Sequence, residues 1–184
     1  MFPKRILLFL FLLTSLAQGQ TYIKANALTA LVLAPNVGVE TTISKHFTFQ
    51  VDVTASFWKS INHAPFQLVM LTPELRYHFK ENTKGFYIGA HLGGSIFKLQ
   101  KWNYANSDDY QKGFNYFAGA TIGYQTAISK NLALDFFLGG GTQQAFYNGY
   151  YLSTGERYEH VQKYNKSGEW LPYRGGVMIC YKLN

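Results

Sequence analysis

The sequence alternates between apolar and polar residues over most of its length, and this period of two is its most constraining feature. In the run PELRYHF at 73–79, every second residue is apolar or aromatic, and the residues between are polar or charged. Successive side chains of a β-strand point to opposite faces, so the run predicts a strand with one apolar and one polar face. The pattern recurs in strand after strand, with aromatics on one face. It therefore predicts a transmembrane β-barrel, which turns its apolar residues to lipid and its polar residues to the lumen.

Eight segments fit this pattern. They are predicted at residues 22–32, 36–43, 47–57, 66–79, 85–98, 113–127, 132–146 and 170–183. The connections after the second, fourth and sixth segments are short, whereas the intervals 58–65, 99–112 and 147–169 are longer. Bacterial outer-membrane barrels combine an even strand number with short periplasmic turns and longer external loops. We therefore expect an all-β fold: an eight-stranded antiparallel up-and-down barrel in a Gram-negative outer membrane, with both termini in the periplasm.

The N-terminus has the pattern of a signal peptide. Lys4 and Arg5 precede an apolar run at 6–13, and Ala17-Gln18-Gly19 has the small-x-small form of a cleavage site. A membrane-anchor helix is the alternative, but it needs about 20 apolar residues and this run is shorter. We expect a signal peptide at 1–19 and one barrel domain at 20–184.

The charge of the chain bears on its partners. The 17 basic and 10 acidic residues give a net charge of +7, which raises the question of nucleic acid. The lysines are scattered over predicted turns and loops, so we expect no nucleic-acid partner. Basic loops are attracted to anionic membrane surfaces, which favours outer-membrane lipid and lipopolysaccharide as the surroundings of a monomeric barrel.

Charged residues on the predicted lumen face form the candidate site. An eight-stranded barrel is just filled by its side chains, and an unpaired buried charge costs several kcal/mol. We expect a structural network of paired charges; the alternative is a partly hydrated lumen with looser pairing. The residues of this predicted network are Lys24, Glu40, Asp52, Glu74, Arg76, His91, Asp135 and Lys182.

No pattern indicates catalysis, a cofactor or a metal. Paired carboxylates can serve acid–base chemistry, but mixed charges are the ordinary filling of a small lumen. His78 and His91 lack a third ligand, and the adjacent Asp108 and Asp109 lack a ligand spacing. The single cysteine, Cys180, is expected to be a small buried residue. We therefore expect a protein that is not an enzyme.

Several motifs point to a family. The chain has Lys24-x-Asn26, then PNVGVE at 35–40, PELRY at 73–77 and Gly89-x-His91. These motifs resemble the family called domain of unknown function 3575. The resemblance implies a small exported outer-membrane barrel whose role is not established, and it supplies no catalytic residue.

The expected function is structural or surface-interacting, through the loops at 99–112 and 147–169, since loops on rigid scaffolds often carry function. A lipid-modifying enzyme and a narrow pore are two alternatives. A third is a soluble periplasmic barrel of the lipocalin type, which would place Phe47, Phe49, Val51 and Val53 around an apolar ligand and Asp52 in water.

Overall fold

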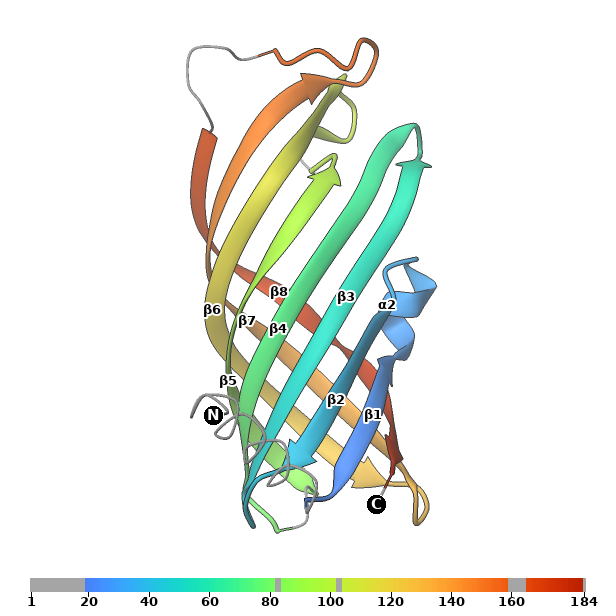
Figure 1. Ribbon diagram of the computed structural model, residues 1–184, viewed down its shortest axis with the longest axis vertical. Helices are drawn as coiled ribbons and strands as arrows, with labels where there is room; N and C mark the ends of the chain where they lie inside the picture. The colour runs from blue at the N-terminus through green and yellow to red at the C-terminus, as the bar shows by residue number, and fades with distance from the viewer. Residues whose placement is uncertain (1–18, 82–83, 102–103, 159–164, 184) are drawn as a thin grey trace, which may run out of the picture.

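The computed structural model describes residues 19–81, 84–101, 104–158 and 165–183, which form a closed antiparallel barrel (Figure 1). Each strand pairs with the next, and the last pairs with the first. The predicted count of eight strands is confirmed. The elements are β1 (Thr21–Asn26), α2 (Ala27–Leu31), β2 (Asn36–Thr42), β3 (Phe47–Ile61), β4 (Ala64–His78), β5 (Gly85–Leu99), β6 (Asp109–Ala127), β7 (Leu132–Tyr151) and β8 (Asn165–Lys182). All but Gly19 of the predicted signal peptide lies outside the described residues.

The two ends of the barrel differ. The connections between β2 and β3, β4 and β5, and β6 and β7 lie at one end, where β1 also begins and β8 ends. We call this the turn end; it is at the bottom of Figure 1. The opposite end, where β3 meets β4 and β7 rises furthest, is the loop end.

The barrel is polar inside and apolar outside. Buried side chains include Lys24, Glu40, Asp52 and Arg76, each at most 2% exposed. Large apolar residues on the same strands face outward, such as Val39 on β2, which is 49% exposed. The lipocalin-type arrangement is wrong, because Phe49 is 37% exposed while its neighbour Asp52 is buried. The outward assignment of the apolar face is confirmed.

The first predicted strand, at 22–32, is too long. β1 ends at Asn26, whose side-chain Oδ1 accepts hydrogen bonds from the backbone N–H groups of Leu28 and Thr29. Asn at such a position caps a helix N-terminus, and the short helix α2 follows. No residue of α2 is buried, and Leu31 is 79% exposed.

The predicted loops are also too long. β3 and β4 are joined by a turn at Asn62 and His63, both with positive φ (50° and 68°), so the predicted loop at 58–65 is wrong. A two-residue hairpin turn with positive φ at both positions matches the twist of the strands. β6 begins at Asp109, β7 continues to Tyr151 and β8 begins at Asn165. The predicted loops 99–112 and 147–169 therefore shrink to 100–108 and 152–164, parts of which lie outside the described residues.

β8 contains an irregularity that changes which residues face the lumen. The pairing of β7 with β8 shifts register between Gly139 and Gly141, opposite the segment 171–174. An extra residue in one strand reverses the alternation beyond it. Consequently Tyr173 reaches His91 inside the barrel, while Trp170 is 71% exposed.

Candidate functional site

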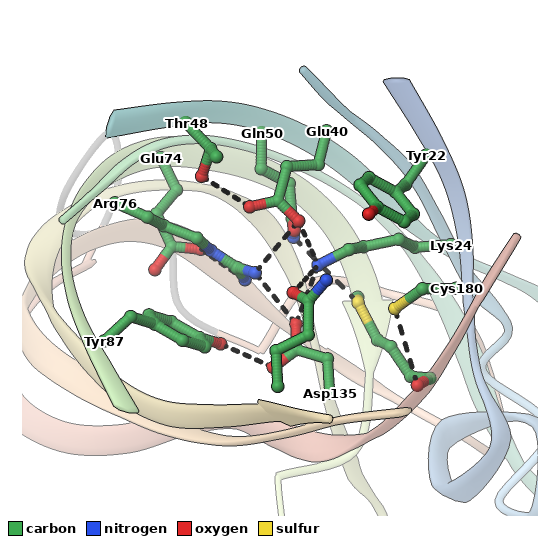
Figure 2. A network of polar contacts seen from close by, with 12 residues as sticks. Tyr22, Lys24, Glu40, Thr48, Gln50, Glu74, Arg76, Tyr87, Asp135 and Cys180 are labelled. Carbon is green, nitrogen blue, oxygen red and sulfur yellow. Dashed lines mark hydrogen bonds and ion pairs between the residues drawn. The ribbon is translucent and has the colours of Figure 1, made fainter. Parts of the chain in front are cut away.

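The lumen near the turn end is closed by a network of buried ions, which Figure 2 shows from close by. Asp135 on β7 lies at its centre. Its Oδ2 accepts hydrogen bonds from Lys24 Nζ and Arg76 Nη1, both at 2.8 Å, and its Oδ1 accepts one from the Tyr87 hydroxyl at 2.8 Å. Lys24 also forms an ion pair with Glu40 Oε2. These side chains come from five strands and meet across the lumen.

Arg76 connects this cluster to a second one closer to the loop end. Its Nε and Nη2 donate to Glu74 Oε2 at 3.0 and 2.9 Å. Arg174 Nη1 donates to the same oxygen at 3.1 Å, and Arg174 Nη2 donates to Asp52 Oδ2 at 2.8 Å. The guanidinium of Arg76 also stacks 4.5 Å over the ring of Tyr87. Hydrogen bonds between ionised donors and acceptors, as here, are stronger than those between neutral groups.

Every strand contributes to the network. Six strands supply the charged groups, β5 supplies Tyr87, and β6 supplies Gln125, whose Oε1 accepts from Lys24 Nζ at 3.4 Å. The members are Lys24, Glu40, Asp52, Glu74, Arg76, Tyr87, Gln125, Asp135 and Arg174. Inward-facing residues of all eight strands thus form one shared structure, which we call the charged plug.

Glycines on the inner face make room for the plug. A Cβ on Gly89 would overlap Glu74 Oε1, and a Cβ on Gly123 would overlap the ring of Tyr87. A larger residue at either position would displace a member of the plug. The inward glycines of β5 and β6 therefore give the side chains of Glu74 and Tyr87 the space they occupy in the plug.

Two residues of the predicted network are not brought into the plug by any ion pair. His91 is buried, but its ring nitrogens hydrogen-bond with Thr121 Oγ1 and Tyr173 Oη at 3.0 and 2.7 Å. Lys182 is half-buried at the turn end, beside Tyr22 in the sheet, and pairs with no carboxylate among the described residues. Arg174 belongs to the plug although the predicted network lacks it. The alternation of the last predicted strand places Arg174 on the lumen face, so the sequence could have indicated it.

Beyond the plug the lumen opens into a cavity of about 620 Å³ toward the loop end. Three inward rings line it, from Phe97, Phe117 and Phe137, together with Leu68 and Met70. Arg174 and Asp52 form part of its floor, where they are already paired with each other.

The rim of this cavity carries Lys101, whose ammonium lies 4.0 Å over the ring of Tyr147. Burial lowers the pKa of Lys101, against the opposing effect of Glu169, which also lines the rim. The cavity therefore has an apolar body with charge at its floor and rim, a form common to sites for small ligands.

Comparison with known proteins gives a family and nothing closer. The model of a family described as "Protein of unknown function (DUF3575)" matches residues 5–183. The chain belongs to the DUF3575 family. The resemblance seen in the motifs is thereby confirmed. No curated protein and no solved structure matches this DUF3575 protein.

The motifs that carry the DUF3575 resemblance coincide with the plug. Lys24 and Glu40 belong to the first two motifs, and Glu74 and Arg76 to the third. Gly89, in the last motif, gives Glu74 its space. The recognisable part of the sequence is thus largely the part that closes the lumen.

The buried histidines and the cysteine of this DUF3575 protein contact other buried groups. His91 bonds to its two partners through both ring nitrogens, whereas His78 has Nε2 3.1 Å from Thr48 Oγ1 and no hydrogen-bond partner at Nδ1 among the described residues. Cys180 is buried and its Sγ donates to the Met178 carbonyl at 3.7 Å. No group of three potential metal ligands occurs in the described part of the chain.

Proposed function

We propose that this protein is exported through a cleaved signal peptide at 1–19 and inserted as a barrel in the outer membrane of a Gram-negative bacterium. The turn end lies in the periplasm and the loop end faces outward. Its role there is non-enzymatic: a plugged scaffold that presents a surface outside the membrane. No helix in the described residues is long and apolar enough to span a bilayer.

The observation that carries this proposal is the inverted distribution of polarity. Ionic side chains close the interior near the turn end, whereas isoleucine, leucine, valine and aromatic residues cover the outside of all eight strands. In water, such a surface is far beyond the few hundred Å² of contiguous apolar patch usual for a soluble monomer. In a bilayer it is the favourable surface, because the apolar side chains contact lipid and the ladders between neighbouring strands pair most of their backbone groups.

The presented surface is aromatic and basic. At the loop end, Tyr150 stacks on the buried Tyr110 with ring centroids 5.3 Å apart, and the exposed Phe114 stacks on Phe146 at 5.2 Å. Lys98 lies 5.1 Å from the Tyr110 ring. Lysine amines held near aromatic rings at a membrane boundary favour contact with anionic lipid headgroups. Lipopolysaccharide phosphates have this chemistry.

The location predicts heat-modifiable mobility. Membrane fractions loaded in SDS without boiling should give a faster band than boiled samples, because a closed barrel resists SDS until heated. Soluble periplasmic fractions should contain none of the protein. Protein found in the soluble fraction, with one mobility in both samples, would contradict both the membrane location and the closed barrel in detergent.

The surface role predicts an asymmetry between the two ends of the barrel. Replacing Lys98, Lys112 and Lys166 with glutamine should weaken binding to vesicles that contain lipopolysaccharide, and high salt should weaken it in the unaltered protein.

The matched control replaces three exposed lysines at the turn end, Lys45, Lys80 and Lys130, and removes the same charge. It should bind like the unaltered protein when the vesicles are added to oriented barrels from the loop-end side. Equal losses in both triple variants would mean that net charge alone decides binding and that the loop end has no special role.

A further inference from the structure

The wall of the barrel is incomplete beside the cavity. β1 and β2 have 6 and 7 residues, whereas β3 to β8 have 15 to 20. In the described chain β8 pairs with β1 only over 178–182, and β2 pairs with β3 only over 48–54. Figure 1 shows β1 and β2 ending well short of the loop end of β3, with α2 above them. Among the described residues, no strand lies between the facing edges of β3 and β8 beyond these points.

The cavity lies against this gap. The shortened strands contribute only their ends, Asn26 and Asn36, and α2 contributes Thr29. The segment 171–175 of β8 lines the opposite side of the gap. Leu138, which is 58% exposed on the outer surface, lines the same cavity, so the cavity extends to the outside of the barrel near α2.

The gap is at the level of the apolar belt. On β5, Ile96 is 64% exposed immediately beside the inward Phe97, and on β4, Leu71 is 49% exposed beside the inward Met70. The segment from α2 to β2 is apolar as well: Leu31 and Val32 are 79% and 64% exposed. A side opening surrounded by such residues faces hydrocarbon rather than water.

From this geometry we propose that the cavity takes an acyl chain of a membrane lipid, which enters sideways between β3 and β8. The proposal rests on the membrane location proposed above. Asn, Thr and Gln side chains also line the cavity, but the rings of Phe97, Phe117 and Phe137 form an apolar part of its wall that suits an acyl chain. Lipid chains are the apolar molecules in permanent contact with the opening. A volume of about 620 Å³ lies within the range of about 300–1,000 Å³ typical of small-ligand sites.

The edges of the opening also offer hydrogen-bonding groups to the polar head of the lipid. Strand edges without partners leave backbone N–H and C=O groups unpaired, which hydrocarbon does not tolerate. Some are covered locally: the Asn26 side-chain amide donates to the Gly175 carbonyl at 3.2 Å. Further toward the loop end, the polar head of the same lipid can hydrogen-bond to the edges while its chain occupies the cavity.

The test places one tryptophan in the cavity and compares it with one on the outer face at the same depth. In a background with the three native tryptophans replaced by phenylalanine, Phe97→Trp is paired with Ile96→Trp on β5. Met70→Trp and Leu71→Trp on β4 are the second pair, used if the first does not fold. The variants are reconstituted in vesicles of phospholipid with bromine atoms midway along the acyl chains, because bromine quenches tryptophan only near contact.

We expect Phe97→Trp to lose a fraction of its emission comparable to that of Ile96→Trp. Adding Ala145→Phe, which fills the cavity, should restore the emission of the inward tryptophan alone. The matched substitution Ala118→Phe, on the outer face of β6, should restore neither.

The outcomes separate the two proposals. Quenching of Ile96→Trp without quenching of Phe97→Trp leaves the barrel in the membrane and overturns the entry of a lipid chain. If both tryptophans are quenched and Ala145→Phe does not reduce the quenching of Phe97→Trp, the entry of a lipid chain is also overturned. In that case bromine quenches the inward tryptophan through the barrel wall. Quenching at neither position means that the barrel is not in the bilayer, and both proposals fail.

Discussion

Arg76→Ala is expected to lower the free energy of unfolding of the barrel by about 3–5 kcal/mol. The Arg76 guanidinium is fully buried and donates to both Glu74 and Asp135. Removing it leaves Asp135 with Lys24 alone and Glu74 with Arg174 alone, so four buried carboxylates share two cations. An undercompensated buried charge is far more costly than the loss of a single hydrogen bond. The loss can be measured from the urea concentration at which the heat-modifiable band disappears from barrels folded in lipid vesicles.

An exposed ion pair provides the control. Lys45 Nζ lies 3.6 Å from Glu81 Oε1, and both side chains are more than half exposed. Exposed pairs contribute about 0–1 kcal/mol, so Lys45→Ala should change stability little. A stability of Arg76→Ala equal to that of Lys45→Ala would show that the lumen is hydrated enough to solvate the released carboxylates, and the charged plug would lose its structural role.

The period-two pattern was sufficient to predict the barrel and the faces of its strands. Within a strand, odd and even positions face opposite sides, so the alternation assigns each residue to the lumen or to the outside. The buried positions of Lys24, Glu40 and Arg76 could therefore be predicted from the sequence. Parity does not give the depth of a residue or its neighbours across the lumen, because these depend on the stagger between strands. The contact of Asp135 with both Lys24 and Arg76 therefore required the structure.

The sequence did not predict the side opening, because alternation is lost over 28–33 and the predicted first strand runs to 32. Asn26 before this run is a helix N-cap signal that was available. The sequence also contained a sign of the cavity. Phe97, Phe117 and Phe137 stand at positions that alternate toward the lumen, where polar residues are expected. For the bulge in β8, the only sign in the sequence was the run of glycines at 139–141 in the neighbouring strand. The position of the bulge depends on the pairing of Gly141 with Leu171, which the sequence does not give.

The membrane location predicts that the free-energy cost of an arginine on the outer face depends on its depth in the bilayer. Leu92 lies near the middle of the outward apolar residues of β5 and is 63% exposed, and Phe86 lies at the turn end of the same strand, 68% exposed. Arginine on the lipid face costs about 2–4 kcal/mol at the bilayer midplane and about 0–1 kcal/mol near the interface. Leu92→Arg should therefore destabilise the barrel in vesicles by about 2–4 kcal/mol, and Phe86→Arg by much less.

Alanine at the same two positions separates the charge from the lost side chain, so the cost of arginine is taken relative to Leu92→Ala and Phe86→Ala. Urea unfolding in vesicles measures all four variants. On a barrel in water, both arginines would stand on an exposed surface, where substitutions usually change stability by no more than about 0.5 kcal/mol. Small and equal effects at Leu92 and Phe86 would thus contradict the bilayer location. A large effect at Leu92 alone would support it, because these two exposed residues of one strand differ chiefly in their depth.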